Sequence, residues 1–271
     1  MFVRPPAVAG RFYPDDPDEL TSMIGEYVDA ERERKPAIGA VAPHAGYIYS
    51  GHVAGVVYSK LKLPSRIIIL CPNHTGMGAP LAIMKSGSWR TPLGELQIDP
   101  ELGDALMNAD PQLEDDTRAH RMEHAIEVHL PFLQVLQKQE TRFVPIAVGV
   151  SGWASLETLG KAIGNTVATL DRSTLILASS DMNHYESDAV TRIKDARAID
   201  PLLRLDPRGL HDTVRQEGIS MCGAGPATAM LVAALMLGAT RAELVKYATS
   251  AEVSGDFDRV VGYAGVLVSA G

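Results

Sequence analysis

Histidine recurs just behind the apolar, strand-like runs of this chain. Three of these runs are each followed within a few residues by an imidazole, at His44, His74 and His184. Ligands of open α/β sheets gather outside the carboxyl ends of the strands, so we expect the three rings to meet at one edge of a sheet. One such coincidence would mean little, but three in one chain indicate a metal centre or a catalytic cluster.

Proline and glycine hold the first two histidines on stiff corners. Pro43 directly precedes His44, Pro72 stands two residues before His74, and a glycine follows each histidine at the second position. Proline restricts the backbone and glycine permits a tight turn. A histidine that only satisfies backbone groups in such a turn is the competing explanation for either residue taken alone.

A carboxylate and a third imidazole follow the apolar run Thr174–Ala178, at Asp181 and His184. Asp181 could bind a metal, orient an imidazole through its Nδ1–H, or cap the helix that follows. His184 follows a strand too apolar for the surface and is a candidate for the same cluster. Tyr185 offers a phenol as a hydrogen-bond donor or as part of a pocket wall.

The chain has two cysteines, Cys71 and Cys222, which excludes a disulfide scaffold and predicts reduced thiols in a reducing compartment. Cys222 lies in a glycine-rich turn before an apolar helix. There the helix macrodipole should lower the pKa of the thiol and favour the thiolate, which binds metals. A buried, inert cysteine is the alternative. Cys71, inside a strand, is assigned to the core.

A second histidine-rich segment contains two glutamates. His120 to His124 match H-x-x-E-H, the inverted zinc-peptidase signature. That signature needs a helix already running at His120, whereas the preceding residues have the composition of a loop, and Pro131 disfavours a long helix through the segment. We therefore expect Glu123, His124 or Glu127 to support metal ligands or to shape a pocket.

Apolar runs rich in β-branched residues alternate with segments of helical length and pattern. This alternation predicts an α/β domain whose central, largely parallel or mixed sheet is flanked by helices. The predicted strands are Ile38–Ala42, Arg66–Cys71, Phe143–Val148, Thr174–Ala178, Leu244–Thr249 and Val260–Val268. The predicted helices are His52–Leu61, Pro100–Asn108, Leu156–Leu170, Ser187–Ile199, Pro207–Glu217 and Pro226–Leu237. The segment Ser86–Ile98 is predicted to form a hairpin that extends the sheet.

Length and composition favour a single domain over residues 1–271, because no internal segment has the composition of a linker. The chain is 46% hydrophobic and 21% charged, and no apolar run approaches the roughly 20 residues that span a bilayer. The N-terminus lacks the pattern of a signal peptide, so we expect a cytoplasmic protein. A formal net charge of −8 argues against nucleic acid as a partner.

Several of these segments, taken in order, resemble the Memo family. They are Val3–Pro14, Pro43–Tyr47, Pro72–His74, Glu123–Phe132, Ser179–Asp181 with His184, and Cys222–Gly223. Memo proteins are similar in fold and in pocket position to class III (LigB-type) extradiol dioxygenases, which are non-haem iron enzymes. The resemblance also implies an association with radical-SAM and AMMECR-type proteins.

The resemblance implies a metal site and assigns roles within it. The matching ligands are His44, His74 and Cys222, while Asp181 and His184 line the same pocket. His184 then occupies the position of the catalytic acid–base histidine of the dioxygenases. Their third ligand is a carboxylate, whereas a thiolate is softer and accommodates Cu(I) or Zn(II) as readily as Fe(II). Extradiol cleavage is therefore not inherited from the fold.

Three functions follow as hypotheses. The leading one is a metal-dependent redox protein that holds one iron or copper ion, leaves positions open for dioxygen or an organic substrate, and moves protons through His184. Asp181 or the segment Glu123–Glu127 would orient that imidazole. The second is a binding module whose pocket holds a small molecule, a peptide or a partner protein without turnover. The third is zinc-dependent hydrolysis, with His184 or Glu123 as the base.

Overall fold

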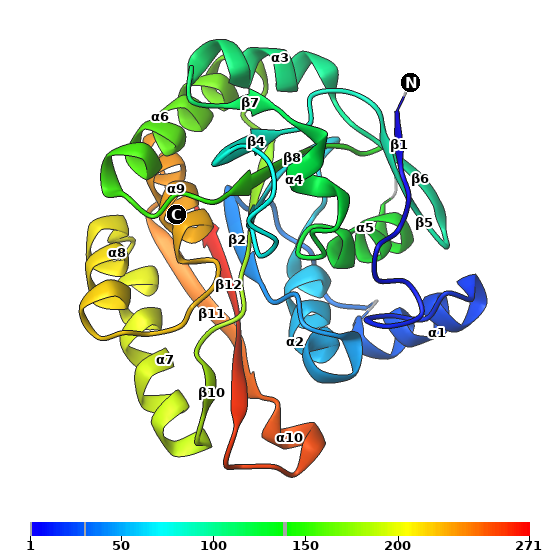
Figure 1. Ribbon diagram of the computed structural model, residues 1–271, viewed down its shortest axis with the longest axis vertical. Helices are drawn as coiled ribbons and strands as arrows, with labels where there is room; N and C mark the ends of the chain where they lie inside the picture. Colours follow the sequence, from blue (N-terminus) through cyan, green and yellow to red (C-terminus); the bar gives the residue numbers. More distant parts are fainter. Residues whose placement is uncertain (1, 30, 138–139) are drawn as a thin grey trace.

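A mixed β-sheet lies at the centre of the computed structural model, which describes residues 2–29, 31–137 and 140–271 (Figure 1). Its strands are β2 (Gly39–Ala42), β3 (Arg66–Pro72), β4 (Leu81–Ile83), β7 (Glu114–Asp115), β8 (Arg142–Val148), β9 (Leu175–Ser179), β10 (His184–Glu186), β11 (Arg241–Thr249) and β12 (Val260–Ser269). Neighbouring strands follow the order β10-β12-β2-β9-β3-β8-β4-β7, and β11 pairs with β12. The inner strands β2, β9, β3 and β8 are parallel, and β12 is antiparallel to β2, β10 and β11.

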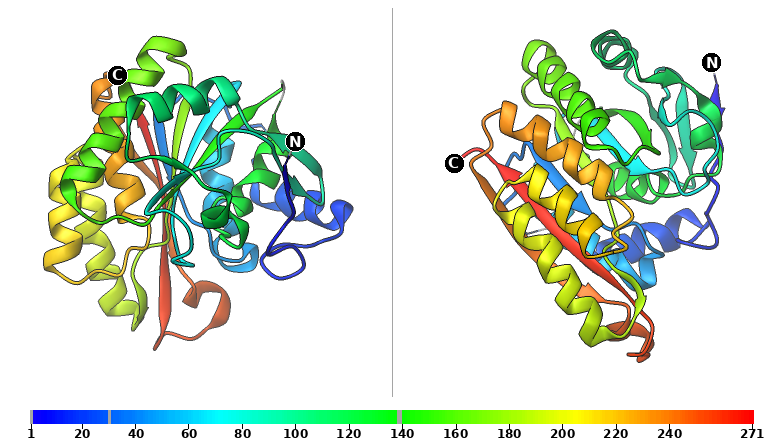
Figure 2. Two further views of the ribbon diagram at one scale, coloured as in Figure 1. Left: turned by 45° about the horizontal axis from the view of Figure 1, so that its top comes forward. Right: turned by 60° about the vertical axis from the view of Figure 1, so that its left-hand side comes forward.

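Helices cover both faces of this sheet. One face carries α1 (Pro17–Tyr27), α2 (Tyr47–Lys60) and α5 (Leu130–Leu136). The other carries α3 (Pro100–Ala109), α6 (Trp153–Leu170), α7 (Asp188–Leu203), α8 (Pro207–Gln216) and α9 (Ala224–Met236). The left-hand view of Figure 2 shows the strands between α7 and α8 on one side and α1 and α2 on the other. The expected α/β domain is confirmed.

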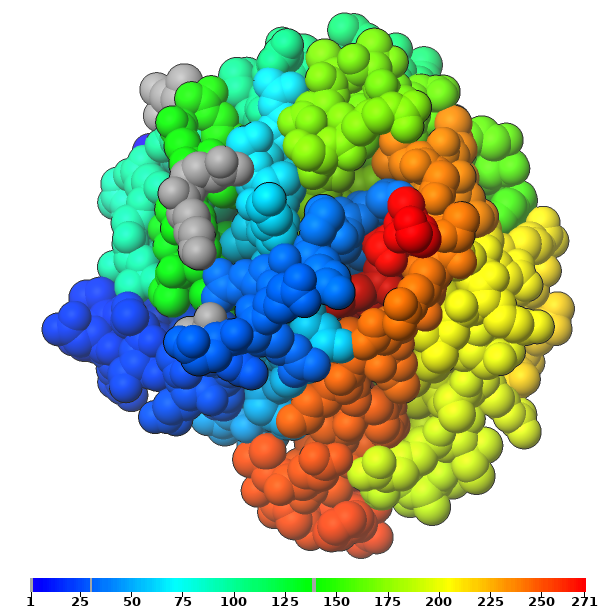
Figure 3. All heavy atoms as spheres, turned by 180° about the vertical axis from the view of Figure 1, so that it is seen from behind, coloured from blue at the N-terminus to red at the C-terminus, as the bar shows by residue number. Residues whose placement is uncertain are grey.

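Burial on both faces explains why the inner strands are apolar without interruption. Successive residues of a strand point to opposite faces. Ile68 and Leu70 therefore join the core under α6 and α9, whereas Ile67 and Ile69 join the core under α2. Seen from behind, β11 is a half-exposed orange band between α2 in blue and α7 and α8 in yellow-green to yellow (Figure 3).

The predicted hairpin forms, but it does not extend the central sheet as expected. Strands β5 (Ser88–Thr91) and β6 (Gly94–Gln97) are antiparallel, and Gly94 has a φ of 111°, which glycine adopts without strain. β5 pairs in parallel with β1 (Val3–Arg4) in a separate sheet. Trp89 of β5 is fully buried, and the guanidinium of Arg4 lies 4.0 Å from the centroid of its ring. This contact fixes the N-terminal strand against the hairpin.

Helix α2 begins earlier than the predicted His52, at Tyr47. Its N-cap is Gly46, which gives no side-chain signal, and so the helix follows directly on the corner that carries His44. Short elements complete the chain: α4 (Thr117–Arg121), the 3₁₀ turn η1 (Glu127–His129) and α10 (Ala251–Ser254). Among the residues described, no helix combines the length and the apolar character needed to cross a membrane.

The parallel inner strands determine where the site can form. Because β2, β9 and β3 are parallel neighbours, their carboxyl ends meet at one edge of the sheet. The loops that leave this edge carry His44, His74 and Asp181. Cys222 stands in the turn before α9, which packs against the same three strands.

Candidate metal centre

A cavity of about 590 Å³ lies at this edge of the sheet. The side chains singled out in the sequence as first candidates all line it, namely His44, His74, Asp181, His184 and Cys222. The predicted convergence of the three imidazoles is therefore present in the structure. The ring centroids of His44 and His74 are 5.1 Å apart, and one ligand atom each from His44, His74 and Cys222 lies within 4.8 Å of the others.

His44 is held on three sides. Its Nδ1 lies 2.7 Å from Ser179 Oγ, its backbone N–H donates to Asp181 Oδ1 at 2.8 Å, and its Nε2 lies 3.3 Å from Cys222 Sγ. Burial, and next the neighbouring imidazoles, lower the pKa of His44 well below its ordinary value. The ring is thus neutral, which is the form of histidine that binds metals.

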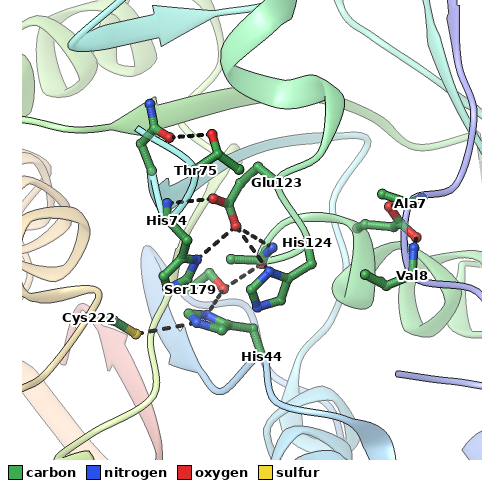
Figure 4. Close-up of polar contacts among 12 residues, drawn as sticks. Ala7, Val8, His44, His74, Thr75, Glu123, His124, Ser179 and Cys222 are labelled. Carbon is green, nitrogen blue, oxygen red and sulfur yellow. Dashed lines mark hydrogen bonds and ion pairs between the residues drawn. The ribbon is translucent and has the colours of Figure 1, made fainter. Parts of the chain in front are cut away.

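His74 is oriented by a buried carboxylate. Its Nδ1 donates to Glu123 Oε1 at 2.9 Å and its backbone N–H donates to Glu123 Oε2 at 2.6 Å (Figure 4). Burial would lower the pKa of His74, but the hydrogen bond and charge of Glu123 raise it. Burial would likewise raise the pKa of Glu123, but His74 and the N–H of Ala125 lower it. A carboxylate behind an imidazole is the usual support of a metal-binding histidine.

Cys222 lies beside the N-terminus of α9, whose N-cap is Gly223. The expectation that this position lowers the pKa of the thiol is wrong, because burial and then the charge of Asp181 raise it. The hydrogen bonds from Ser180 and from the backbone at Gly223 act in the lowering direction but are the smaller effects. The positive charge of a bound cation is what would convert the thiol to the thiolate. Cys71 is fully buried in β3, in the core as expected.

Asp181 does not cap a helix, since Ser187 caps α7. Its Oδ1 accepts the N–H of His44, and its Oδ2 lies 4.0 Å from Nε2 of the same residue. Burial raises the pKa of Asp181 to about 7, against the lowering effect of the N–H groups of His44 and Ala45. The carboxyl group thus faces the same space as the candidate ligands.

His184 is oriented by a residue that the sequence did not reveal. We expected Asp181 or the segment Glu123–Glu127 to hold this ring, but its Nδ1 donates to the carbonyl of Ser220 at 2.9 Å and its N–H donates to Ser220 Oγ at 2.7 Å. Burial lowers the pKa of His184. With Nδ1 engaged, Nε2 is the nitrogen available to the cavity. Ser220 stands two residues before Cys222, so its hydrogen bonds to His184 connect the loop after β9 with the turn that carries Cys222.

His124 also lines the cavity, and its ring stacks on that of His74 at a centroid distance of 4.9 Å. His74, Glu123 and His124 form a second group of residues close enough to hold an ion. In that group, however, Nδ1 of His74 is hydrogen-bonded to Glu123, and His124 Nδ1 lies 3.5 Å from the same oxygen. The geometry thus places Glu123 behind the two rings as their support.

Glu127 serves the N-terminal segment instead of the imidazoles. Its carboxylate accepts hydrogen bonds from the guanidinium of Arg4, the N–H groups of Ala7 and Val8, and the hydroxyl of Tyr13. Figure 4 shows Ala7 and Val8 well to one side of the imidazole cluster. The same segment carries Phe12 into the cavity wall, so Glu127 contributes to the shape of the pocket from a distance.

The zinc-peptidase signature does not form. Helix α4 ends at Arg121, so His120 and His124 do not share a helical face. His120 is fully buried, with its ring centroid 5.8 Å from that of Trp89, and burial lowers its pKa to about 4. This imidazole belongs to the core beneath the hairpin.

Tyr185 forms part of the pocket wall, one of the two roles considered for it. Its backbone has a φ of 62°, in the left-handed region that few non-glycine residues occupy, and its side chain is 66% exposed. Strained backbone of this kind is concentrated at functional sites. Phe12, which sequence reasoning passed over, forms another part of the wall, with its ring centroid 4.7 Å from that of His124.

The donor set suits a transition metal. His44 and His74 both engage Nδ1 with a protein acceptor, which leaves the two Nε2 atoms for an ion, and the thiol adds a soft ligand. An α/β sheet whose carboxyl edge brings imidazoles, a carboxyl group and a thiol to one cavity defines a candidate metal-binding protein.

The chain belongs to the Memo family, because it matches the Memo-like proteins over residues 4–267. It is 42% identical to a MEMO1 family protein of Methanopyrus kandleri over an alignment of 281 residues that covers 99% of both chains. It is 43% identical to a MEMO1 family protein of Pyrobaculum arsenaticum over 279 residues, covering 98% of this chain and 99% of the relative. For one of Methanosarcina barkeri the identity is 41% over 267 residues, covering 98% and 100%.

Proposed function

We propose that the protein binds one iron or copper ion through His44, His74 and Cys222 and uses it for redox chemistry that involves dioxygen or an organic substrate. The observation that carries this proposal is the approach of the three ligand atoms to within 4.8 Å of one another in a cavity large enough for a small molecule. Two imidazoles and a thiolate are ligands that Fe(II), Cu(I) and Zn(II) accept.

A redox-active ion at this position supplies electron transfer, which the side chains of the pocket cannot provide. The chain's own residues then bind, orient and move protons. His184 would donate or accept a proton at Nε2, since Ser220 holds its Nδ1–H. Phe12, Tyr185 and Val261 line the cavity with apolar surface that would hold an organic substrate beside that nitrogen.

Oxygen consumption by metal-loaded protein tests the proposal. Wild type, His184→Ala and His52→Ala are loaded with Fe(II) or Cu(I) to equal occupancy and supplied with a reductant and a panel of catechols. A positioned acid or base contributes ~10²–10⁴-fold, so His184→Ala should lose its metal-dependent rate while retaining the ion. His52 lies on α2 and is not among the cavity residues, so His52→Ala should behave as wild type.

Equal rates in wild type and His184→Ala would contradict the proton-transfer role. If wild type has no metal-dependent rate under any of these conditions, the redox proposal fails and the binding module becomes the better explanation. A metal-dependent hydrolysis supported only by Zn(II) would instead favour the hydrolase. These outcomes are distinguishable because each variant's metal content is measured before the assay.

A further inference from the structure

The hydroxyl of Ser179 lies between two imidazoles at the end of β9. Its Oγ is 2.7 Å from His44 Nδ1 and 2.8 Å from His129 Nε2. It also lies 2.6 Å from the carbonyl oxygen of Ala125, to which it donates. Ser179 and His129 are fully buried, and His44 is almost so. Figure 4 shows Ser179 beside His44, and the two contacts of this ring with Ser179 and Cys222 involve different nitrogens.

Counting hydrogens at Ser179 determines how both rings are protonated. A hydroxyl has one hydrogen to donate and can accept two hydrogen bonds, while a carbonyl can only accept. The hydrogen of Ser179 therefore goes to Ala125, and both imidazoles must donate to Oγ, His44 through Nδ1–H and His129 through Nε2–H. A neutral imidazole has a single N–H, so Nε2 of His44 and Nδ1 of His129 carry no hydrogen.

The surroundings of the other two nitrogens agree with this assignment. Nδ1 of His129 is buried and has no hydrogen-bond partner among the described residues, as suits an atom with no hydrogen to donate. Nε2 of His44 lies 3.3 Å from Cys222 Sγ, and the single hydrogen of this thiol has two acceptors within reach, that nitrogen and the carbonyl oxygen of Asp181 at 3.6 Å. Nδ1–H also donates in His74, to Glu123, and in His184, to Ser220. Ser179 thus completes a pattern in which the cavity-lining rings of His44, His74 and His184 all engage Nδ1 and leave Nε2 for the cavity.

We propose that Ser179 is a positioning residue that fixes His44 in the Nδ1–H form, so that the unprotonated Nε2 faces Cys222 and His74 ready to bind a metal. Without this hydroxyl, Nδ1–H loses its acceptor, and the competing Nε2–H form can turn its hydrogen toward Asp181 Oδ2, 4.0 Å away. A metal would then have to displace that proton. The consequence for metal binding rests on the proposed function, whereas the protonation pattern does not.

Nuclear magnetic resonance of the metal-free protein, labelled with ¹⁵N at histidine, tests the pattern directly. Long-range ¹H–¹⁵N correlations distinguish the two neutral forms of each ring. Wild type should show His44 as Nδ1–H and His129 as Nε2–H. Ser179→Ala should shift His44 toward Nε2–H, whereas Ser179→Thr, which keeps the hydroxyl, should preserve the wild-type form. Wild type with His44 as Nε2–H overturns the proposal, even if no variant folds.

Ser59→Ala is the matched control, because it also removes a buried serine hydroxyl, one that bonds the N–H of Asp29 and the carbonyl of Gly55 on α2. It should change no site imidazole. Cu(I) affinity is then measured by competition with a chromophoric chelator, and Ser179→Ala should bind ~10–100-fold more weakly than Ser59→Ala. Equal affinities, or a His44 that keeps Nδ1–H in Ser179→Ala, contradict the proposal. If wild type binds neither Cu(I) nor Fe(II), the proposed metal site is refuted, whereas the NMR spectra of the metal-free protein still test the protonation pattern.

Discussion

Replacing Glu123 by glutamine separates the orienting role of this carboxylate from its bulk. The side chain is fully buried, and both of its oxygens accept hydrogen bonds. Oε1 accepts from His74 Nδ1 at 2.9 Å and from the N–H of Ala125 at 3.0 Å, while Oε2 accepts from the N–H of His74 at 2.6 Å. Glutamine keeps the size but turns one of these acceptors into an NH₂ donor.

Either orientation of the amide leaves donors facing each other. With NH₂ in the place of Oε2, the N–H of His74 loses its acceptor. With NH₂ in the place of Oε1, the N–H of Ala125 loses its acceptor and His74 is driven to the Nε2–H form, which opposes metal binding. A buried donor without a partner costs ~1–3 kcal/mol. Loss of a carboxylate that supports a metal-binding histidine lowers the affinity for the metal by about 10–100-fold.

Two measurements check this prediction: chemical denaturation of metal-free protein and a chelator competition for Cu(I). Glu127→Gln is the matched control, since Glu127 is an equally buried carboxylate whose partners lie in the N-terminal segment. Both variants should lose stability, but only Glu123→Gln should lose metal affinity. Wild-type affinity in Glu123→Gln, or an equal loss in both variants, would refute the orienting role.

Two further predictions concern the cysteines and a buried acid outside the cavity. Cys222→Ser should lose most of its bound metal, as measured by elemental analysis. Cys71→Ser should keep its metal but lose ~1–3 kcal/mol of stability, because it places a hydroxyl in the core. Equal metal loss in both variants would show that Cys222 is wrongly preferred over Cys71 as the ligand. Asp195 is fully buried, and burial raises its pKa to about 6. Ionisation of Asp195 is therefore less favourable in the folded than in the unfolded protein, so the stability of the wild type falls between pH 4 and pH 6. Asp195→Asn avoids this cost, because the amide can accept the N–H of Asn183 and donate to the hydroxyl of Tyr247. The stability of Asp195→Asn relative to wild type, measured by denaturation, should rise by up to about 3 kcal/mol between pH 4 and pH 6. A stability difference that does not change with pH would contradict a raised pKa of Asp195.

The placement of the site could be predicted because it depends on backbone topology. Apolar runs before His44, His74 and Asp181 mark parallel inner strands, and the carboxyl ends of such strands share an edge. The same reasoning failed for the hairpin β5–β6, because its partner β1 is only two residues long and leaves almost no pattern in the sequence.

The partners of the site side chains could not be predicted, because loop geometry determines them. Ser220 holds His184 through one carbonyl and one hydroxyl, and neither has a signature beyond a serine in a glycine-rich turn. The pKa of Cys222 is raised, whereas the sequence predicted that it would be lowered, because burial of the thiol and the charge of Asp181 outweigh the hydrogen bonds that lower it. Ser179 could have drawn attention as a polar residue at the end of an apolar strand, but its two imidazole partners come from distant segments.

Anomalous diffraction from crystals of the protein, isolated without oxygen from its native host, tests the central claim most directly. Data collected on both sides of the iron, copper and zinc absorption edges identify the ion and locate it in one experiment. We expect a single iron or copper peak within bonding distance of His44 Nε2, His74 Nε2 and Cys222 Sγ. A peak held instead by Glu123 and His124, a peak at the zinc edge alone, or no peak in the cavity would contradict the account.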